Sequence, residues 1–229
     1  MVEISDFLKT VSYPGRGIIF GITPNGDSLV AAYFLMGRSE NSRNRVFETD
    51  GKAIRTKAFD EAKLTDPSLV IYYPLRSCGN ILILTNGDQT ETIYQYIREG
   101  HSFEDALRTR TYEPDSLLTP RISGIMDLSD GSYRLSILKS NEDKKCNRFF
   151  YEYPGDLGLG HFISTYIGDN SNPLPFSSEP LTIGIEQNID SFTNNIWHSL
   201  NEDNKVALFV KYISLETKEI TTKIVNKYQ

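Results

Sequence analysis

The sequence predicts an α+β fold with mostly antiparallel strands, and three observations support this prediction. Short apolar runs rich in β-branched and aromatic residues recur along the chain, which contains 13 Tyr and 12 Phe among 229 residues. Asn-Gly and Asp-Gly pairs separate several of these runs, and such pairs favour tight hairpin turns. Stretches with helical spacing occur only in the middle of the chain and near its ends, which is typical of an α+β protein with one or two sheets.

The first part of the chain is expected to form a short helix followed by a β-hairpin. Residues 4–11 have helical character, with Ser5 or Asp6 as the cap. A turn over 13–17 leads into a strand over 17–23. Asn25-Gly26 then marks a hairpin turn, and the return strand is expected over 28–36. This return strand is almost continuously apolar, as expected for a strand that is buried on both faces.

The next part of the chain predicts four strands and then two helices. The strands are expected over 46–49, 53–59, 68–75 and 80–85, with Asp50-Gly51 as a hairpin turn between the first two. Apolar residues at helical spacing predict a helix over 90–99, which Gly100 ends. A second helix over 103–108 follows Ser102 as its cap.

The remainder of the chain predicts more hairpins and one further helix. Strands are expected over 122–127, 133–139, 149–153, 161–167, 181–185, 206–214 and 220–225, and a helix over 189–200. The glycine-rich stretch 154–160 and the polar, proline-containing stretch 168–180 are expected to be loops. Because no linker or internal repeat interrupts the pattern, residues 1–229 are expected to form one domain.

Composition limits the classes of function. The formal net charge is -6, which argues against a broad nucleic-acid or anionic-membrane surface but leaves room for one small cationic pocket. No apolar run is long enough to span a membrane, and the N-terminus lacks the features of a signal peptide. With only Cys78 and Cys146, the protein is expected to be cytoplasmic with reduced thiols. Histidine and cysteine are too scattered to predict a metal site.

The residues 37–45, GRSENSRNR, form the most informative polar segment because they follow a predicted strand directly. Arginine presents a planar fork of donors that binds phosphate or carboxylate in a bidentate manner. The segment therefore predicts an anion-binding edge that includes Arg38, Ser39, Arg43, Asn44 and Arg45, and Arg16 in the preceding turn is expected to join it. The alternative is an exposed turn whose arginines pair with surface carboxylates.

Two further polar segments lie next to predicted elements. Asn86, Gly87 and Asp88 separate a strand from a helix, where backbone N–H groups favour an anion or a ligand amide. A simple helix cap by Asp88 is the alternative.

The second segment is the stiff, proline-containing loop at 112–121, which contains Glu113, Thr119 and Arg121. A partly buried carboxylate in this loop could act as a base beside the arginine, and an ordinary salt bridge in the loop is the alternative.

Three stretches of the sequence resemble one known family. They are YPGRGIIFGITPNGDSLVAAYFLMGRSENSRNRVF (13–47), ILILTNGDQTETI (81–93) and YEPDSLLTPRISGI (112–125). These are similar to the IMP cyclohydrolases of archaeal type and their bacterial relatives, and GRSxxSRNR and TPRI are the most specific parts. The resemblance extends over most of the chain.

The resemblance implies a fold and a reaction. The implied fold is a four-layer αββα sandwich with mostly antiparallel sheets, similar to N-terminal-nucleophile hydrolases, although Met1 and Val2 are not nucleophiles. The implied reaction, in de novo purine biosynthesis, is the dehydrative closure of 5-formamidoimidazole-4-carboxamide ribonucleotide to inosine monophosphate. A purine nucleotide is then the partner, and no cofactor is needed.

Roles for individual residues follow as expectations from this reaction. The catalytic candidates are Arg38, Tyr73, Asp88 and Glu113, with either acid as the base, and Arg121 is expected to tune that acid. The substrate-binding candidates are Arg16, Tyr33, Ser39, Arg43, Asn44, Arg45, Asn86, Gly87, Thr119 and Arg121. The arginines at 38, 43 and 45 are expected to hold the phosphate or orient the reacting oxygen, and Asn86 to bind the carboxamide.

Two alternative functions remain at this point. An amide hydrolase on the same scaffold would need a Cys, Ser or Thr exposed as a new N-terminus. A purine-nucleotide-binding protein would keep the arginine pocket without turnover. A homo-oligomer is compatible with either function, whereas an RNA-binding module is disfavoured by the acidic composition and the absence of an aromatic RNA-binding motif.

Overall fold

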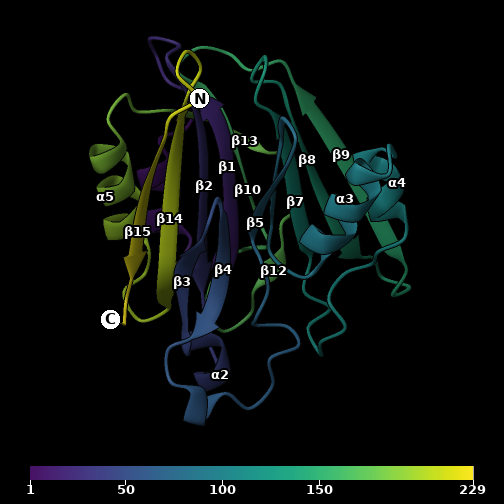
Figure 1. Cartoon of the computed structure of the whole chain (residues 1–229). Coiled ribbons are helices and arrows are strands. Elements are labelled where there is room, and N and C mark those ends of the chain that lie inside the picture. Colours follow the sequence, from purple (N-terminus) through teal and green to yellow (C-terminus); the bar gives the residue numbers. More distant parts are fainter. Residues whose placement is uncertain (229) are drawn as a thin grey trace.

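Two antiparallel β-sheets and a few helices make up the structure, a computed structural model that describes residues 1–228 (Figure 1). The first sheet has six strands in the order β13-β10-β1-β2-β14-β15. These strands are β1 (Arg16–Ile22), β2 (Ser28–Met36), β10 (Leu159–Ser164), β13 (Leu181–Gly184), β14 (Lys205–Ser214) and β15 (Ile220–Asn226). The predicted first hairpin and the C-terminal hairpin thus lie side by side in one sheet, joined by β2 and β14.

The second sheet has seven strands in chain order, so that each strand pairs with the next one along the chain. These are β3 (Arg45–Asp50), β4 (Ala53–Ala58), β5 (Leu75–Cys78), β6 (Ile81–Thr85), β7 (Arg121–Asp127), β8 (Tyr133–Ser140) and β9 (Cys146–Tyr153). The pairing of β4 with β5 is limited to Ile54 and Leu75. The sheet therefore splits beyond Ile54, and the loop after β4 lies along the split.

The longer helices lie on the outer faces of the sheets, and the short helix α2 lies at the lower end of the molecule in this view (Figure 1). Side chains of α1 (Ile4–Thr10) and α5 (Ile189–Ser199) share an apolar cluster with the first sheet. Side chains of α3 (Gln89–Arg98) and α4 (Phe103–Arg108) share another with the second sheet. The short elements are α2 (Glu40–Arg43), the 3-10 turn η1 (Glu61–Lys63), and the small hairpin of β11 (Tyr166–Ile167) and β12 (Leu174–Pro175).

The largest apolar core lies between the two sheets. Phe20, Tyr33 and Phe209 contribute to it from the first sheet, and Phe47 and Leu84 from the second. The intervening residues of β1 and β2 face the cluster under α1 and α5 instead. The continuous apolar run of β2 was predicted to be buried on both faces, and this prediction is confirmed.

Most of the predicted elements are confirmed, but the strand predicted over 68–75 is wrong. Residues 68–74 form turns, and β5 begins only at Leu75. The carbonyl of Pro67 accepts hydrogen bonds from the backbone of Val70 and Ile71, which curls the chain, and Pro74 has no N–H to give to a sheet. The helix α2 and the strand β12 were not predicted, because both lie in polar segments without apolar periodicity. The strand predicted over 161–167 is divided in the structure into β10 and β11, with Thr165 between them.

Gly124 in β7 packs closely against Phe20 of the first sheet. A Cβ atom at this position would lie 2.5 Å from Phe20 Cε2 and 2.9 Å from Leu135 Cδ2. We expect Gly124→Ala to reduce the free energy of unfolding by about 1–3 kcal/mol, as overpacked cores do, in urea titrations. Gly184→Ala is the matched control, because its Cβ would meet only Glu3 Oε1 at 3.8 Å. Equal stabilities of the two variants would contradict close packing at Gly124.

Two general expectations can also be compared with the structure. Both Cys78 and Cys146 are free thiols, as expected. Within residues 1–228, no helix combines the length and the apolar character that crossing a membrane requires.

Candidate active site

A pocket of about 480 Å³ opens where β1, β3 and β7 begin and β2 ends. Its lining combines arginines, hydroxyl groups, aromatic rings and one acid. The lining includes Arg16, Arg38, Ser39, Arg45, Asp115, Thr119 and Tyr166. The antiparallel topology thus brings together segments that are up to 150 residues apart in sequence. Five of the predicted site residues, Arg16, Arg38, Ser39, Arg45 and Thr119, meet in this pocket.

Arg45 is the most unusual of these residues because its charge is buried without compensation. Its side chain is 0% exposed, and its Nε donates to the carbonyl oxygen of Ser42 at 2.8 Å. Neither Nη1 nor Nη2 has a hydrogen-bond partner within residues 1–228. Burying an unpaired ion costs several kcal/mol even after relaxation of the protein. A guanidinium kept in this state beside a pocket is suited to an anionic ligand.

Arg16 and Glu113 form a buried ion pair close to Arg45. The distance between Arg16 Nη2 and Glu113 Oε2 is 3.5 Å, and the Glu113 side chain is 2% exposed. The backbone N–H of Glu113 donates to the carbonyl of Thr119, which holds the loop before β7 against the pocket. Arg16 Nε also lacks a partner within the described residues. Two buried arginines with one carboxylate leave a net positive charge here.

Asn86 holds Glu113 in place rather than facing an open site. Its Nδ2 donates to Glu113 Oε1 at 3.1 Å and to the carbonyl of Pro120. Its Oδ1 accepts from Gln89 Nε2 and from the backbone of Ile122. Both N–H groups and both lone pairs of this amide are thereby used. The expected contact between Asn86 and a substrate carboxamide is therefore not supported by this geometry.

Arg121 and Asp88 form the outer part of the same polar network. Arg121 Nη1 lies 2.6 Å from both Asp88 Oδ1 and Gln89 Oε1. A second arginine, Arg110, also donates to Asp88. Gly87 allows this arrangement, because a Cβ there would lie 2.8 Å from Arg121 Nη1. Of the predicted residues Asn86, Gly87, Asp88 and Arg121, only Asn86 hydrogen-bonds to Glu113, and Arg121 is connected to Asn86 through Gln89. All four residues, and Glu113 itself, lie outside the pocket lining.

The pKa values distinguish the two acids that were candidates for the base. Burial raises the pKa of Glu113 above its usual range, against the charges of Arg16 and Arg121, which act to lower it. For Asp88, partial burial acts to raise the pKa, but the hydrogen bond from Arg110 and the charge of Arg121 lower it overall. A raised pKa brings a carboxyl group closer to the pH at which it can exchange protons. Glu113 is thus better suited to acid–base chemistry.

Two tyrosine hydroxyl groups lie near the buried arginines. The hydroxyls of Tyr33 and Tyr72 are 2.8 Å apart, and both side chains are buried. Burial and the neighbouring Tyr72 raise the pKa of Tyr33, while the charges of Arg16 and Arg45 act in the opposite direction. These influences show that the arginines and the hydroxyl pair share one environment. Sequence reasoning predicted Tyr33 but missed Tyr72.

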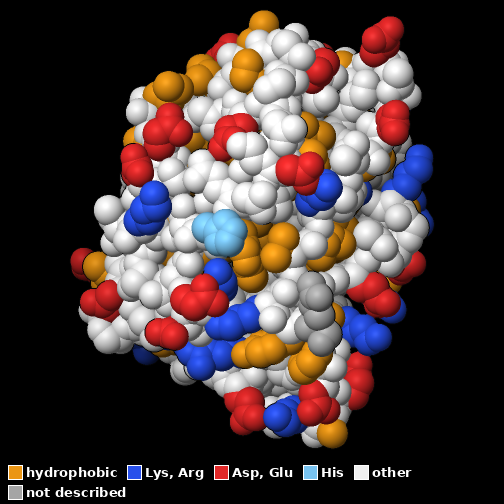
Figure 2. Space-filling view, turned by 90° about the vertical axis from the view of Figure 1, so that its left-hand side faces the viewer, with side chains coloured by type: hydrophobic (Ala, Val, Ile, Leu, Met, Phe, Trp, Pro, Cys, Tyr) orange, Lys and Arg blue, Asp and Glu red, His pale blue; other side chains and the backbone are white. Residues whose placement is uncertain are grey.

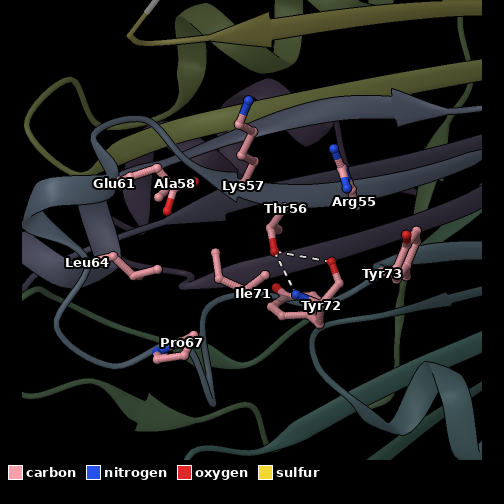
Figure 3. A pocket seen from close by; sticks show the side chains of 10 residues that line it. All are labelled: Arg55, Thr56, Lys57, Ala58, Glu61, Leu64, Pro67, Ile71, Tyr72 and Tyr73. Carbon is pink, nitrogen blue, oxygen red and sulfur yellow. Dashed lines mark hydrogen bonds between the residues drawn. The ribbon is translucent and has the colours of Figure 1, made fainter.

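Tyr73, the tyrosine predicted in place of Tyr72, lies in a different pocket (Figure 3). This second pocket of about 410 Å³ lies along the split between β4 and β5. Tyr73 donates from its hydroxyl to Asp50 Oδ2 at 2.7 Å. The backbone N–H of Tyr72 donates to Thr56 Oγ1, which fixes Tyr72 in the lining of this second pocket, while its hydroxyl meets that of Tyr33. Tyr73 is therefore not brought together with Arg16 and Arg45.

The remaining predicted residues lie around the rim. Arg38 Nη1 donates to the carbonyl of Asn170 and lies over the ring of Tyr13. Ser39 caps α2 in a capping box with Ser42, which turns the chain so that Arg45 points inward. Thr119 Oγ1 lies 2.6 Å from the hydroxyl of Tyr166.

Arg43 and Asn44 lie outside the pocket lining. Arg43 donates to Gly37 O and Asn204 Oδ1, and the side-chain amide of Asn44 exchanges hydrogen bonds with the backbone of Asp60. These contacts hold β3 in position. As to metals, residues 1–228 contain no group of three or more His, Cys, Asp or Glu that could hold an ion.

The pocket is lined by the buried guanidinium groups of Arg16 and Arg45, and Glu113, a carboxyl group of raised pKa, lies next to the pocket as the partner of Arg16. This combination is typical of an enzyme site for a small anionic substrate. Comparison with known proteins identifies the family. The profile of the IMP cyclohydrolase-like protein family matches residues 13–218. The chain belongs to this family, which confirms the resemblance seen in its sequence.

Several archaeal proteins named IMP cyclohydrolase are similar to this chain. The protein of Methanosphaera stadtmanae is 30% identical over 159 residues, which is 67% of this chain and 73% of the relative. That of Methanococcus maripaludis strain C7 is 31% identical over 159 residues, or 67% of this chain and 74% of the relative. That of Methanocella arvoryzae is 35% identical over 119 residues, which cover 50% of this chain and 57% of the relative.

Proposed function

We propose that this protein is an IMP cyclohydrolase that closes the purine ring of 5-formamidoimidazole-4-carboxamide ribonucleotide to form inosine monophosphate. The observation that carries the proposal is the buried, unpaired guanidinium of Arg45 beside the Arg16–Glu113 pair. The family membership supplies the reaction, and this cluster supplies groups that suit it. The proposed catalytic unit is one domain over residues 1–229, in line with the family match over 13–218.

The reaction needs an acid–base group and a site for negative charge. The carboxamide nitrogen attacks the formyl carbon, the C=O double bond becomes a C–O single bond, and negative charge develops on the formyl oxygen. The attacking nitrogen then loses a proton, and the formamido nitrogen loses its proton as the ring C=N double bond forms. The former formyl oxygen gains two protons in exchange, its C–O bond breaks, and it leaves as water. An amide nitrogen is a weak nucleophile, so holding the two groups in contact accounts for much of the catalysis.

Glu113 is the proposed acid–base group. Its burial keeps its pKa raised, so the same carboxyl can accept the proton from nitrogen and pass a proton to the departing oxygen. Arg16 and Asn86 orient this carboxyl group, because Arg16 contacts Oε2 and Asn86 donates to Oε1. In this assignment Asp88, Asn86 and Arg121 position Glu113, and Gly87 allows Arg121 to approach.

The proposed role of Arg45 is to stabilise the negative charge on the formyl oxygen, helped by the hydroxyl groups of Tyr33 and Tyr72. Preorganised donors act most strongly where water is excluded, and Arg45 is 0% exposed. The phosphate, which is strongly hydrated, is proposed to stay at the open rim beside Arg38 and Ser39. In this assignment Tyr73, Arg43 and Asn44 have no part in the chemistry.

We further propose that the fold is the four-layer αββα sandwich of N-terminal-nucleophile hydrolases. The three apolar clusters, one between the sheets and one under each pair of helices, support this assignment. The alternative of an amide hydrolase has less support. Neither Cys78 nor Cys146 lines the pocket, and the hydroxyl residues that do, such as Ser39 and Thr119, would have to be exposed as a new N-terminus by cleavage of the chain.

The acidic composition supports a small nucleotide, rather than a nucleic acid, as the ligand. On the face that carries α5 and β15, acidic and basic side chains are interspersed (Figure 2). This face therefore lacks the broad basic surface that a nucleic-acid backbone would need.

The test is to incubate the purified protein with the formylated ribonucleotide and to follow formation of inosine monophosphate by its ultraviolet absorbance. We expect turnover by the wild-type chain and a raised KM for Arg38→Ala, because Arg38 is placed at the phosphate. Binding of inosine monophosphate without ring closure would instead support the nucleotide-binding alternative. Absence of both binding and turnover would contradict the assignment of the pocket.

A further inference from the structure

The strand β9 is an edge strand of the second sheet, and its outer side is not covered by other parts of the described chain. The other edge strands, β3, β13 and β15, are each covered or protected by charge. At β3, the side-chain amide of Asn226 accepts from Phe47 N at 2.8 Å and donates to Phe47 O at 3.1 Å. At β13, the backbone of Val2 donates to Thr182 and forms a bridge with Ile183. These contacts occupy some of the backbone groups at which another strand would pair.

The edge strand β15 is protected by charge. Lys223 lies in the middle of this strand, and its Nζ is 2.7 Å from Asp190 Oδ1 on α5. A lysine on an edge strand discourages pairing with another chain, because pairing would bury the charge. In contrast, β9 is eight residues long and reads CNRFFYEY, with aromatic side chains on both faces. Phe149 is 39% exposed.

The direction of the backbone groups of β9 follows from its hairpin with β8. Asn141 N donates to Lys145 O at 2.9 Å, so these two residues form a hydrogen-bonded pair at the end of the hairpin. The next pair along the two strands is Ser140 with Cys146, and the pairing continues in this register along β9. Hydrogen-bonded pairs alternate in antiparallel sheets, so Asn147, Phe149 and Tyr151 point their backbone groups toward β8. Those of Arg148, Phe150 and Glu152 point outward. Within residues 1–228, these outward N–H and C=O groups have no hydrogen-bond partner beyond the strand.

This edge is complementary to a second copy of itself. If two β9 strands pair antiparallel about Phe150, the outward groups of Phe150 meet those of Phe150 in the second copy. The same register sets Arg148 opposite Glu152 on one face and Phe149 opposite Tyr151 on the other. Opposite charges and aromatic pairs at such positions stabilise a sheet. Shifting the register to centre on Phe149 sets Arg148 opposite Phe150 and loses the charge pairing.

The contacts that Arg148 and Glu152 already make are compatible with pairing of two β9 strands. Arg148 already donates to the carbonyls of Leu107 and Arg110, which holds its guanidinium on the face that carries α4. Glu152 is on the same face, and its side chain is 75% exposed, with Arg134 at 3.6 Å. Neither side chain would have to leave a buried partner for the two strands to meet.

We propose that β9 is a dimerisation edge, at which two copies of this chain join their seven-stranded sheets into one continuous antiparallel sheet. The pairing uses the outward backbone groups of Arg148, Phe150 and Glu152. It is a two-fold, self-complementary contact of the kind that closes a dimer and leaves no free edge at β9.

The test is sedimentation velocity of the full chain from low to high micromolar concentration. We expect a monomer–dimer equilibrium for the wild type. Glu152→Pro removes an outward N–H without taking a hydrogen bond from β8, and we expect it to weaken dimerisation at least tenfold. Glu152→Gln keeps the backbone and loses only the charge, so we expect a smaller effect. A wild-type chain that stays monomeric throughout would overturn the proposal, as would an equally strong dimer of folded Glu152→Pro.

A second measurement keeps the test decisive if Glu152→Pro does not fold. Phe149→Lys adds a charge at an exposed position of the edge, and we expect it to weaken the dimer at least tenfold as well. Hydrogen exchange of the wild type should protect the amides of Arg148 and Phe150 only at high concentration, and that of Tyr151 at all concentrations. Concentration-independent exchange of Arg148 and Phe150 in a dimeric protein would place the interface elsewhere.

Discussion

Arg45→Met is expected to remove turnover while making the ligand-free protein more stable. Methionine keeps the apolar stem of the side chain but removes a buried charge whose two Nη atoms have no partner within residues 1–228. Replacing buried ions with apolar residues of similar volume often stabilises a protein by about 1–4 kcal/mol. The lost hydrogen bond to Ser42 offsets about 1 kcal/mol of this gain. We therefore expect a Tm that is equal to or a few degrees above that of the wild type, by calorimetry.

The loss of activity in Arg45→Met should be large. Removing one donor to a developing oxyanion reduces kcat by roughly 10²–10³-fold in other enzymes. Both Nη atoms of Arg45 lack a hydrogen-bond partner among the described residues 1–228, so we expect a reduction in kcat/KM at or beyond the upper end of this range. Arg45→Lys should not restore activity, because an ammonium group cannot reproduce the planar fork.

The matched control for Arg45 is Arg108→Met, in which the replaced side chain is 66% exposed on α4. This variant should have normal turnover and an unchanged Tm. Nucleotide should raise the Tm of the wild type and of this control, since a ligand that binds only the folded state stabilises it by mass action. Full activity of Arg45→Met, or a nucleotide-dependent rise in its Tm equal to that of the wild type, would remove Arg45 from the site.

The sequence was sufficient to predict the hairpins because their signals are local. Pairs such as Asn25-Gly26 and Asp50-Gly51 determine where the chain reverses, whatever the rest of the protein does. The meeting of Arg16, Arg45 and Thr119 was also predictable in outline, because each stands near the start of a predicted strand. Which of the clustered arginines is buried was not predictable. The capping box of Ser39 and Ser42 turns the segment so that Arg45 points inward, and composition carries no signal for it.

Tyr73 was predicted as a site residue in place of Tyr72 because a strand was wrongly predicted over 68–75. Strand alternation over 68–75 would set Tyr73 on the same face as Leu75, which is in the core. The turns at 68–74 break this alternation, so that Tyr72 is buried against Tyr33 and Tyr73 faces Asp50. Similarly, the polar type of Asn86 suggested a ligand contact, but its partners come from two other segments: Gln89 from α3, and Glu113 and Pro120 from the loop before β7. Only the folded chain shows that its amide is already occupied.

Glu113→Gln is expected to reduce kcat by about 10²–10⁴-fold, the usual contribution of a positioned acid–base group. Glutamine has nearly the same shape and can still accept the hydrogen bond from Asn86 through its amide oxygen. Nucleotide affinity should therefore change much less than kcat. Circular dichroism should show a folded protein, which would separate this loss from a failure to fold.

The pH dependence gives the sharper test of Glu113. If the ionised carboxylate takes the proton, kcat/KM must fall as the pH drops through its pKa. Burial raises that pKa, so the acid limb should have its midpoint above the value of about 4.3 found for unperturbed glutamate. Glu113→Gln should lack this limb. Asp88→Asn should keep the acid limb. Arg110 and Arg121 lower the pKa of Asp88, and Asp88 is bound to these two arginines rather than facing the pocket. An acid limb that disappears in Asp88→Asn but persists in Glu113→Gln would assign the proton transfer to Asp88.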